Sequence, residues 1–191
     1  MYDAAPDPYC YPGTTVLINR LHLLDQTQLD AFEAEITMQR AAEPFPNGRL
    51  GYRHYCAMHH HIFQDVYAWA GKIRTVRIAK DSSMFCYPEH IDAEMRKLFA
   101  SLRSENHFRE LSASAFSRKT SHFLSELNAI HPFREGNGRT QLALLTLLAE
   151  RAMHPLLLKK LDPHAMLAAM VTSFSGKEMD LRSLIETLIR A

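Results

Sequence analysis

The chain has 191 residues, of which 47% are hydrophobic and 23% are charged. That length suits one domain with a substantial core, and we expect residues 1–191 to form it. The 22 Lys and Arg residues against 21 Asp and Glu residues give a formal net charge of +1. No overall field therefore draws the chain to nucleic acid or to a membrane surface, and any anion must bind at a local site.

The cysteines and the N-terminal segment indicate the compartment. Cys10, Cys56 and Cys86 form an odd, sparse set that suits a reducing cytosol better than a disulfide framework. The N-terminal segment lacks the basic start and apolar run of a signal peptide, and the apolar stretch 142–149 is too short to span a bilayer. We expect a cytoplasmic protein, and delivery to another cell by a signal-independent route stays open.

The N-terminal third predicts an arm followed by two helices. Residues 1–15 are rich in Pro and Tyr and predict an extended arm. Helices are expected over about 25–42 and about 51–69, because apolar residues recur there at helical spacing. The Pro- and Gly-containing segment 43–48 separates them, and Gly71 is expected to end the second helix.

Residues 73–86 predict a small β-hairpin. The segment 73–79 is β-branched and alternating, which places Arg74, Val76 and Ile78 on one face and Thr75, Arg77 and Ala79 on the other. A polar turn follows, and residues 84–87 would form the returning arm.

The remaining two thirds predict a mostly α-helical chain. Pro88 suits the first turn of a helix that runs to about Ser104, and Ser112 or Ser114 would begin the next helix. A very apolar helix begins near Thr140, and we expect it to be the buried centre of a helical bundle. Two short helices are expected at about 162–174 and 179–190.

The segment His131-Pro-Phe-Arg-Glu-Gly-Asn-Gly-Arg139 carries groups suited to phosphate chemistry. Its second half opens the apolar helix, and a helix N-terminus offers free amides and a positive dipole end to a phosphate. Glycines allow a ligand to approach the backbone closely, and Arg139 adds a fork-shaped cation. Glu135 is a hard oxygen ligand suited to Mg²⁺, and His131 can act as a base near neutral pH.

This segment resembles the signature of the Fic family, His-x-Phe-x-Asp/Glu-Gly-Asn-Gly-Arg-x-x-Arg, and every constrained position matches through Arg139. The resemblance covers most of the chain. Residues 11–17 look like the N-terminal segment of short bacterial Fic toxins, and residues 66–76 and 84–91 look like the entry and exit of their flap hairpin. It implies the Fic fold: an all-α bundle around a central apolar helix, with one small hairpin flap.

The resemblance also implies a reaction, the transfer of AMP from ATP to a hydroxyl of a target protein. His131 would deprotonate that hydroxyl, and Glu135 would hold the Mg²⁺ that bridges two phosphates. The implied nucleotide ligands are Gly136, Asn137 and Gly138 as an anion hole and Arg139 on the β-phosphate. The implied docking edge for the target is the flap at Arg77, Ile78, Ala79 and Lys80.

Two positions bear on the reaction and its control. Gly138 favours AMP transfer, because the kinase-like branch of the family has a lysine there. The family's final arginine falls at position 142, where this chain has Leu142. In the family that arginine holds the γ-phosphate and pairs with an inhibitory glutamate, so both functions need another explanation here.

The resemblance to short toxins implies two partners. Autoinhibited relatives carry a Ser/Thr-x-x-x-Glu-Gly/Asn motif in their own chain, and we expect none in this one. A separate small helical antitoxin would then supply the motif. A type II topoisomerase subunit is the first candidate target.

Other interpretations remain open beside these. Leu142 favours a degenerate fold that acts as a nucleotide-regulated binding module. Relatives that transfer another phosphate-linked group suggest a different donor. Glu135 alone could cap the helix that follows it. The triplet His59-His60-His61 suggests a metal, although adjacent helical residues point in different directions and a partly buried His59 explains it better.

Overall fold

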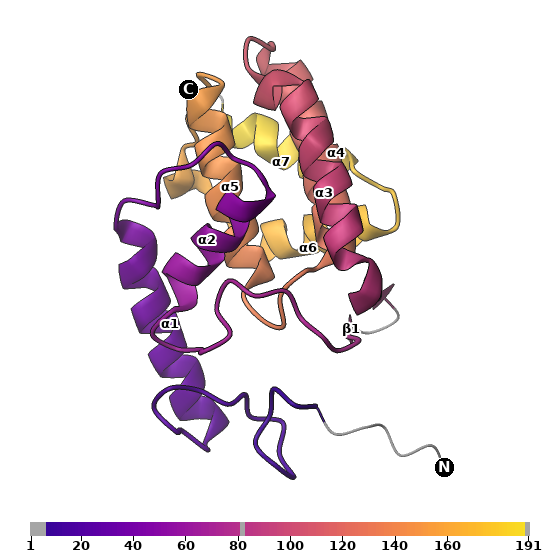
Figure 1. Cartoon of the computed structure of the whole chain (residues 1–191). Coiled ribbons are helices and arrows are strands. Elements are labelled where there is room, and N and C mark those ends of the chain that lie inside the picture. The colour runs from indigo at the N-terminus through magenta and orange to yellow at the C-terminus, as the bar shows by residue number, and fades with distance from the viewer. Residues whose placement is uncertain (1–6, 81–82, 190–191) are drawn as a thin grey trace.

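The computed structural model describes residues 7–80 and 83–189 (Figure 1). Within these ranges the chain forms seven α-helices and one two-stranded hairpin. The helices are α1 (Gln26–Ala42), α2 (Tyr52–Phe63), α3 (Pro88–Ser104), α4 (Ala113–Ile130), α5 (Asn137–Arg151), α6 (Pro163–Phe174) and α7 (Met179–Ile189). The strands are β1 (Ala79–Lys80) and β2 (Ser83–Met84), and short 3₁₀ turns lie at Asn106–Phe108 and Leu158–Lys160.

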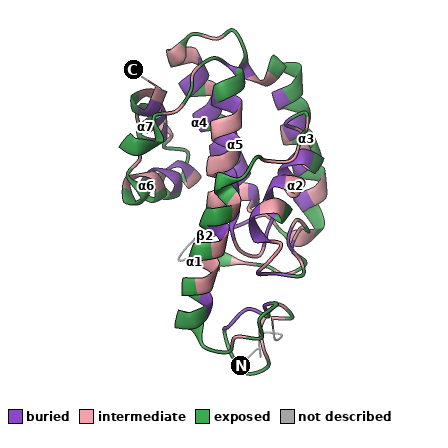
Figure 2. Ribbon diagram, turned by 90° about the vertical axis from the view of Figure 1, so that its left-hand side faces the viewer, coloured by how far each residue is buried: buried purple, intermediate pink, exposed green. Residues whose placement is uncertain are grey.

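The helices form a bundle in which α5 lies between α2 and α4. The outer faces of this layer are covered by α1 on α2 and by α3, α6 and α7 on α4. Leu144, Leu145 and Leu148 of α5 are completely buried, and Figure 2 shows buried residues concentrated on α4 and α5 while α1 is largely exposed. The expected all-α bundle around an apolar helix is confirmed.

Helix starts follow the capping residues that the sequence offers. The side chain of Asp25 accepts a hydrogen bond from the Gln28 amide at the start of α1, and Ser112 accepts one from Ala115 at the start of α4. Pro88 lies in the first turn of α3, where its missing amide costs no hydrogen bond. No helix in the described part of the chain is long and apolar enough to cross a membrane.

The second helix is shorter than the sequence predicts. It ends at Phe63 rather than near Trp69, because the amides of Val66 and Tyr67 both donate to the Phe63 carbonyl and close a turn. The turn buries Val66 and Tyr67 beneath α1 and stacks Tyr67 on Trp69, with ring centroids 4.4 Å apart. Burial of these side chains thus outweighs continuation of the helix.

The hairpin is also shorter than expected. Only Ala79 pairs with Met84 and Lys80 with Ser83, and the turn residues 81–82 lie outside the described ranges. Residues 73–78 keep the predicted alternation of exposure without forming a strand. Their backbone instead reaches the loop between α4 and α5, where the Arg74 amide donates to the Pro132 carbonyl.

The N-terminal arm folds back on itself, contrary to the expected extended arm. Residues 1–6 lie outside the described ranges, and from there Cys10 and Leu17 form an isolated antiparallel bridge. The Tyr9 hydroxyl accepts a hydrogen bond from the Thr75 amide, and its ring lies edge-on to Trp69. The arm therefore packs beside the segment that leads to the hairpin.

Candidate active site

His131 lies at the end of α4, where the helix gives way to the loop. Its amide donates to the Leu127 carbonyl, and its backbone is left-handed with φ 48° and ψ 64°, a conformation that few residues other than glycine adopt. The imidazole stacks on Phe85, which follows β2, with centroids 3.9 Å apart. Its Nδ1 lies 3.3 Å from the Asn128 carbonyl, which favours a proton on Nδ1 and makes Nε2 the basic nitrogen.

Phe133 and Asn137 fix the shape of the loop. The Asn137 side chain accepts from the Phe133 amide at 3.0 Å and donates to the Phe133 carbonyl at 2.8 Å. The Phe133 ring is fully buried and stacks on His59 at 3.8 Å. Because the Asn137 side chain is committed to the loop, only its backbone amide is suited to an anion hole.

The N-terminus of α5 has the features of an anion site. Gly136 caps the helix with φ 81°, and a Cβ there would lie 2.2 Å from the Phe63 ring. The first intrahelical bond runs from the Thr140 amide to the Gly136 carbonyl, so the amides of Asn137, Gly138 and Arg139 precede it, and no side chain in the described ranges caps them. Gly138 is exposed with open space where a Cβ would stand, so a phosphate can approach the first turn.

Glu135 combines the capping and the metal interpretations. Its Oε1 accepts from the Gly136 amide at 2.8 Å and lies 3.5 Å from the Arg139 guanidinium, while 46% of its side chain is exposed. No group of three or more metal-binding side chains occurs in the part of the chain described here. A single exposed carboxylate beside a phosphate site fits Mg²⁺, which phosphates and water mainly hold in such sites. The metal role of Glu135 remains a prediction.

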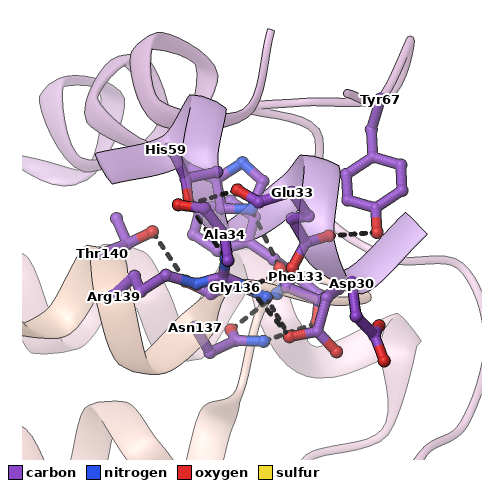
Figure 3. Close-up of polar contacts among 12 residues, drawn as sticks. Asp30, Glu33, Ala34, His59, Tyr67, Phe133, Gly136, Asn137, Arg139 and Thr140 are labelled. Carbon is purple, nitrogen blue, oxygen red and sulfur yellow. Dashed lines mark hydrogen bonds and ion pairs between the residues drawn. The ribbon is translucent and has the colours of Figure 1, made fainter. Parts of the chain in front are cut away.

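Arg139 is held by α1, a contact that no motif in the sequence signals. Its guanidinium lies 2.5 Å from Oε1 of Glu33 and 3.2 Å from Oγ1 of Thr37, and it stacks over the Phe63 ring. The other carboxylate oxygen of Glu33 accepts a hydrogen bond from Tyr67 (Figure 3). Glu33 and Tyr67 therefore join the site only through the packing of α1 over α2.

The His triplet does not converge on one point. His59 is fully buried, and its Nε2 faces the Glu135 carbonyl at 3.0 Å while its Nδ1 accepts from the Gly71 amide at 2.8 Å. His60 faces the Ala70 carbonyl and His61 the Arg40 carbonyl. Each ring is used to support the backbone of a different segment, as the direction of adjacent helical residues predicts.

The sequence model of the Fic/DOC family matches residues 49–149, which include this whole loop. The chain belongs to the Fic/DOC family. Probable protein adenylyltransferase y4lH of Sinorhizobium fredii is 50% identical over 189 residues, which cover 98% of both chains. Protein adenylyltransferase VbhT of Bartonella schoenbuchensis is 35% identical over 187 residues, which cover 96% of this chain but 39% of that protein.

Solved structures agree with the family fold. The BepC protein of Bartonella tribocorum, crystallised with bound AMPPNP, superposes with a TM-score of 0.84 at 22% identity and covers 94% of this chain and 95% of that one. The FIC domain of Bep8 from Bartonella sp. 1-1C superposes with a TM-score of 0.86 at 22% identity and covers 95% of this chain and 94% of that one. At this level of identity the likeness shows the fold alone.

Two residues beside the site contact other parts of the chain. Arg134 pairs with Asp7 at 2.8 Å and its side chain is only 22% exposed, so the N-terminal arm is tied to the loop. Leu142 is half-buried and packs against the main core. It lines an apolar groove of about 460 Å³ between α1 and α5, together with Thr37 and Arg139.

The four expected docking residues lead into β1 and form it. Arg77 is exposed and its guanidinium covers the Tyr87 ring at 4.3 Å, while the Ile78 carbonyl accepts a hydrogen bond from Phe85. Ala79 and Lys80 form β1, which pairs with β2 alone in the described ranges. The second edge of β1 is therefore open to another strand, and the docking role of these residues stays a prediction.

The expectation that the chain lacks the inhibitory motif is wrong, because its sequence contains a formal match. Ser101-Leu-Arg-Ser-Glu105-Asn106 matches Ser/Thr-x-x-x-Glu-Asn at the end of α3. Glu105 pairs there with Lys119 at 2.6 Å. The 17 residues of α3 span about 25 Å, which places Glu105 at the end of α3 opposite the hairpin (Figure 1).

Proposed function

We propose that this Fic/DOC chain is a protein adenylyltransferase that moves AMP from ATP to a hydroxyl side chain of a target protein. The observation that carries the proposal is that residues 131–139 bring together a basic histidine nitrogen in the loop, the open N-terminus of α5 and an arginine in its first turn. The names of the relatives from S. fredii and B. schoenbuchensis support it.

The chemistry needs one base and a rigid phosphate cradle. The target hydroxyl oxygen attacks the α-phosphorus of ATP, its proton passes to Nε2 of His131, and the bond to the β-phosphate oxygen breaks to release pyrophosphate. The amides of Gly138 and Arg139 and the Arg139 guanidinium bind the phosphates through charge-assisted hydrogen bonds. Mg²⁺ held by Glu135 would neutralise phosphate charge.

The hairpin would present the target. A target segment would add to the open edge of β1 by backbone hydrogen bonds, and the returning arm of the same hairpin leads into Phe85, which stacks on His131. Arg77, Ile78, Ala79 and Lys80 would then contact its side chains. Main-chain pairing requires little sequence preference, so the choice of target rests on the exposed side chains of the flap.

We further propose that the chain is the toxin of a cytoplasmic toxin–antitoxin pair. The likeness of residues 11–17 to short Fic toxins supports this, and a small helical antitoxin with a Ser/Thr-x-x-x-Glu motif would be the partner. A type II topoisomerase subunit is the first target to test. The test measures growth when the chain is expressed alone and when it is co-expressed with such an antitoxin. Growth arrest should occur only without the antitoxin.

A second candidate function is a nucleotide-regulated binding module. The observations that favour it are Leu142, which offers no donor to a γ-phosphate, and the engagement of Arg139 by Glu33. Such a module would bind ATP without labelling any protein. An enzyme that transfers another phosphate-linked group would label protein only when the donor is a different nucleotide or phosphodiester.

The decisive experiment uses ATP labelled at the α-phosphate and the His131→Ala variant. The wild type should label target protein, and label at the γ-phosphate should not transfer. His131→Ala should lose on the order of 10²–10⁴-fold of the rate, because the base is removed, while ATP binding by titration stays unchanged. His164→Ala, at an exposed histidine of α6, is the matched control and should behave as wild type. Near wild-type transfer by His131→Ala would sink the assignment of the base.

A further inference from the structure

Arg74 is a fully buried arginine outside the loop, on the segment that leads to the hairpin. It is 1% exposed, and its guanidinium donates to four backbone carbonyls. Nε donates to His131 at 2.8 Å, Nη1 to Val76 at 2.7 Å, and Nη2 to Cys86 at 2.6 Å and to Ile130 at 3.2 Å. A buried cation with this many main-chain acceptors holds several segments of backbone in one arrangement.

Two of these carbonyls define the backbone of His131. The Ile130 carbonyl belongs to the peptide plane before the His131 Cα and the His131 carbonyl to the plane after it, so φ and ψ of His131 are both restrained. The Arg74 amide also donates to the Pro132 carbonyl at 2.9 Å. These are carbonyls at the C-terminus of α4, which lack helical partners and favour a positive charge. Arg74 thereby stabilises the left-handed conformation of His131, which is unfavourable in a residue with a side chain.

The remaining two carbonyls belong to the hairpin. Val76 precedes β1 and Cys86 follows β2, so one guanidinium joins both arms of the flap at its base. The Cys86 amide adds a bond to the Ala129 carbonyl of α4 at 3.0 Å. The flap that would dock the target is thus tied to the backbone of the residue that would take its proton.

We propose that Arg74 is a positioning residue for AMP transfer, which sets the distance between a target hydroxyl docked on the flap and the His131 imidazole. This inference rests on the proposed function. Arg74 makes its bonds to the flap and to the α4 end, whereas the phosphate cradle is built by α5 and α1. Loss of Arg74 should therefore slow the chemical step and leave nucleotide binding unchanged. A lysine at position 74 keeps the charge, but its single ammonium cannot bond all four carbonyls that the planar guanidinium of Arg74 reaches.

The test compares Arg74→Lys and Arg74→Met with Arg40→Lys and Arg40→Met. Arg40 is a half-buried arginine that pairs with Asp65 and Glu43, away from the loop and the flap. We expect kcat for AMP transfer to fall about tenfold in Arg74→Lys and about a hundredfold in Arg74→Met, since a misplacement near 1 Å costs about that much. KM for ATP and the Kd for ATP should stay within about twofold of wild type, and both Arg40 variants should keep wild-type kcat.

The outcomes separate the two claims. A wild type that labels no protein overturns the proposed function. With an active wild type, Arg74 variants of unchanged kcat overturn the positioning role. A parallel loss of kcat, ATP affinity and melting temperature, or failure of both Arg74 variants to fold, also overturns it and leaves a purely structural arginine. A folded Arg74→Lys with lowered kcat and intact ATP affinity supports the inference even if Arg74→Met does not fold.

Discussion

At the scale of single residues, several side chains of the site also support the local backbone or are held by other side chains. The side-chain amide of Asn137 closes the loop, Glu135 accepts a hydrogen bond from the Gly136 backbone amide, and Arg139 is held by the Glu33 carboxylate of α1. Such support restricts rotamers ahead of substrate binding, which is how a site reaches its productive geometry at low entropic cost. A phosphate must therefore share Arg139 with Glu33 or displace it.

Leu142 is the residue whose replacement tests how the γ-phosphate is held. It stands beside Arg139 on α5 and faces the groove against α1, so Leu142→Arg should reach the phosphate end without burying its guanidinium in the core. One added charge-assisted hydrogen bond is worth about 1.5–3 kcal/mol, so ATP should bind about ten- to a hundredfold more tightly. ADP affinity should not change.

The measurement for Leu142→Arg is a calorimetric titration with both nucleotides, run beside a thermal melt. The melt separates a direct effect from misfolding, because a guanidinium forced into the core lowers stability by several kcal/mol. A stable variant with ATP and ADP affinities both unchanged would show that position 142 does not reach the phosphates.

At the scale of elements, the N-terminus of α5 packs closely against the end of α2. The two glycines there, Gly136 and Gly138, differ in how they meet that contact. Gly136 has a positive φ and lies against the Phe63 ring, so the fold itself requires a glycine there. Gly138 is helical and exposed, with nothing within 4 Å of a Cβ built on it. The packing of the described residues therefore does not require glycine there, and we expect the approach of a ligand to do so.

Substitution of the two glycines by alanine should therefore separate folding from binding. Gly136→Ala should lower the free energy of unfolding by about 2 kcal/mol or more, through backbone strain and contact with Phe63. Gly138→Ala should keep or slightly raise stability, because alanine favours a helix by about 0.5–1 kcal/mol, yet it should weaken ATP binding. Urea melts and ATP titrations of both variants measure these effects. Equal ATP affinity in Gly138→Ala and wild type would place the phosphates elsewhere.

At the scale of the whole molecule, two buried clusters meet at the site. The larger cluster surrounds α4 and α5 and includes Phe133, while the smaller lies between α1 and the end of α2 and includes Phe63. His59 stacks on both of these rings and bonds the backbone of Gly71 and of Glu135. The protonation state of this one imidazole therefore bears on the stability of the entire bundle.

Global stability should fall as the solution becomes acidic. Burial lowers the pKa of His59 to about 3 in the folded chain, whereas a histidine in an unfolded chain titrates near 6.5. Between these pH values the unfolded state binds a proton that the native state does not. The free energy of unfolding should thus drop by up to about 1.4 kcal/mol per pH unit below pH 6.5, with no contribution from His59 above it.

Denaturant melts between pH 7.5 and 4.5 would measure this slope in the wild type and in His59→Gln. Glutamine cannot take up the proton, so its slope should be shallower by about one proton's worth over this range. Identical slopes in the two proteins would assign the acid sensitivity to other groups.

The sequence by itself determined the helical bundle, the approximate helix starts and the segment 131–139. The helices follow from the spacing of apolar residues, and their starts follow from residues such as Asp25, Ser112 and Pro88. These signals act between near neighbours in the chain, so they can be read from the sequence. The loop was recognisable because its groups of different chemistry are contiguous. Even a formal match can mislead, as the segment Ser101–Asn106 shows, because the letters do not say on which end of the bundle a segment lies.

Only the tertiary structure decided where α2 ends, how short the hairpin is and which distant residues support the loop. Glu33, Tyr67 and Arg74 reach the site from α1, from the turn after α2 and from the approach to β1. Their positions depend on packing between elements far apart in the sequence, where burial and backbone hydrogen bonds outweigh local preference. An arginine that fans onto four carbonyls has no signature in sequence, because its partners are main-chain atoms that every residue carries.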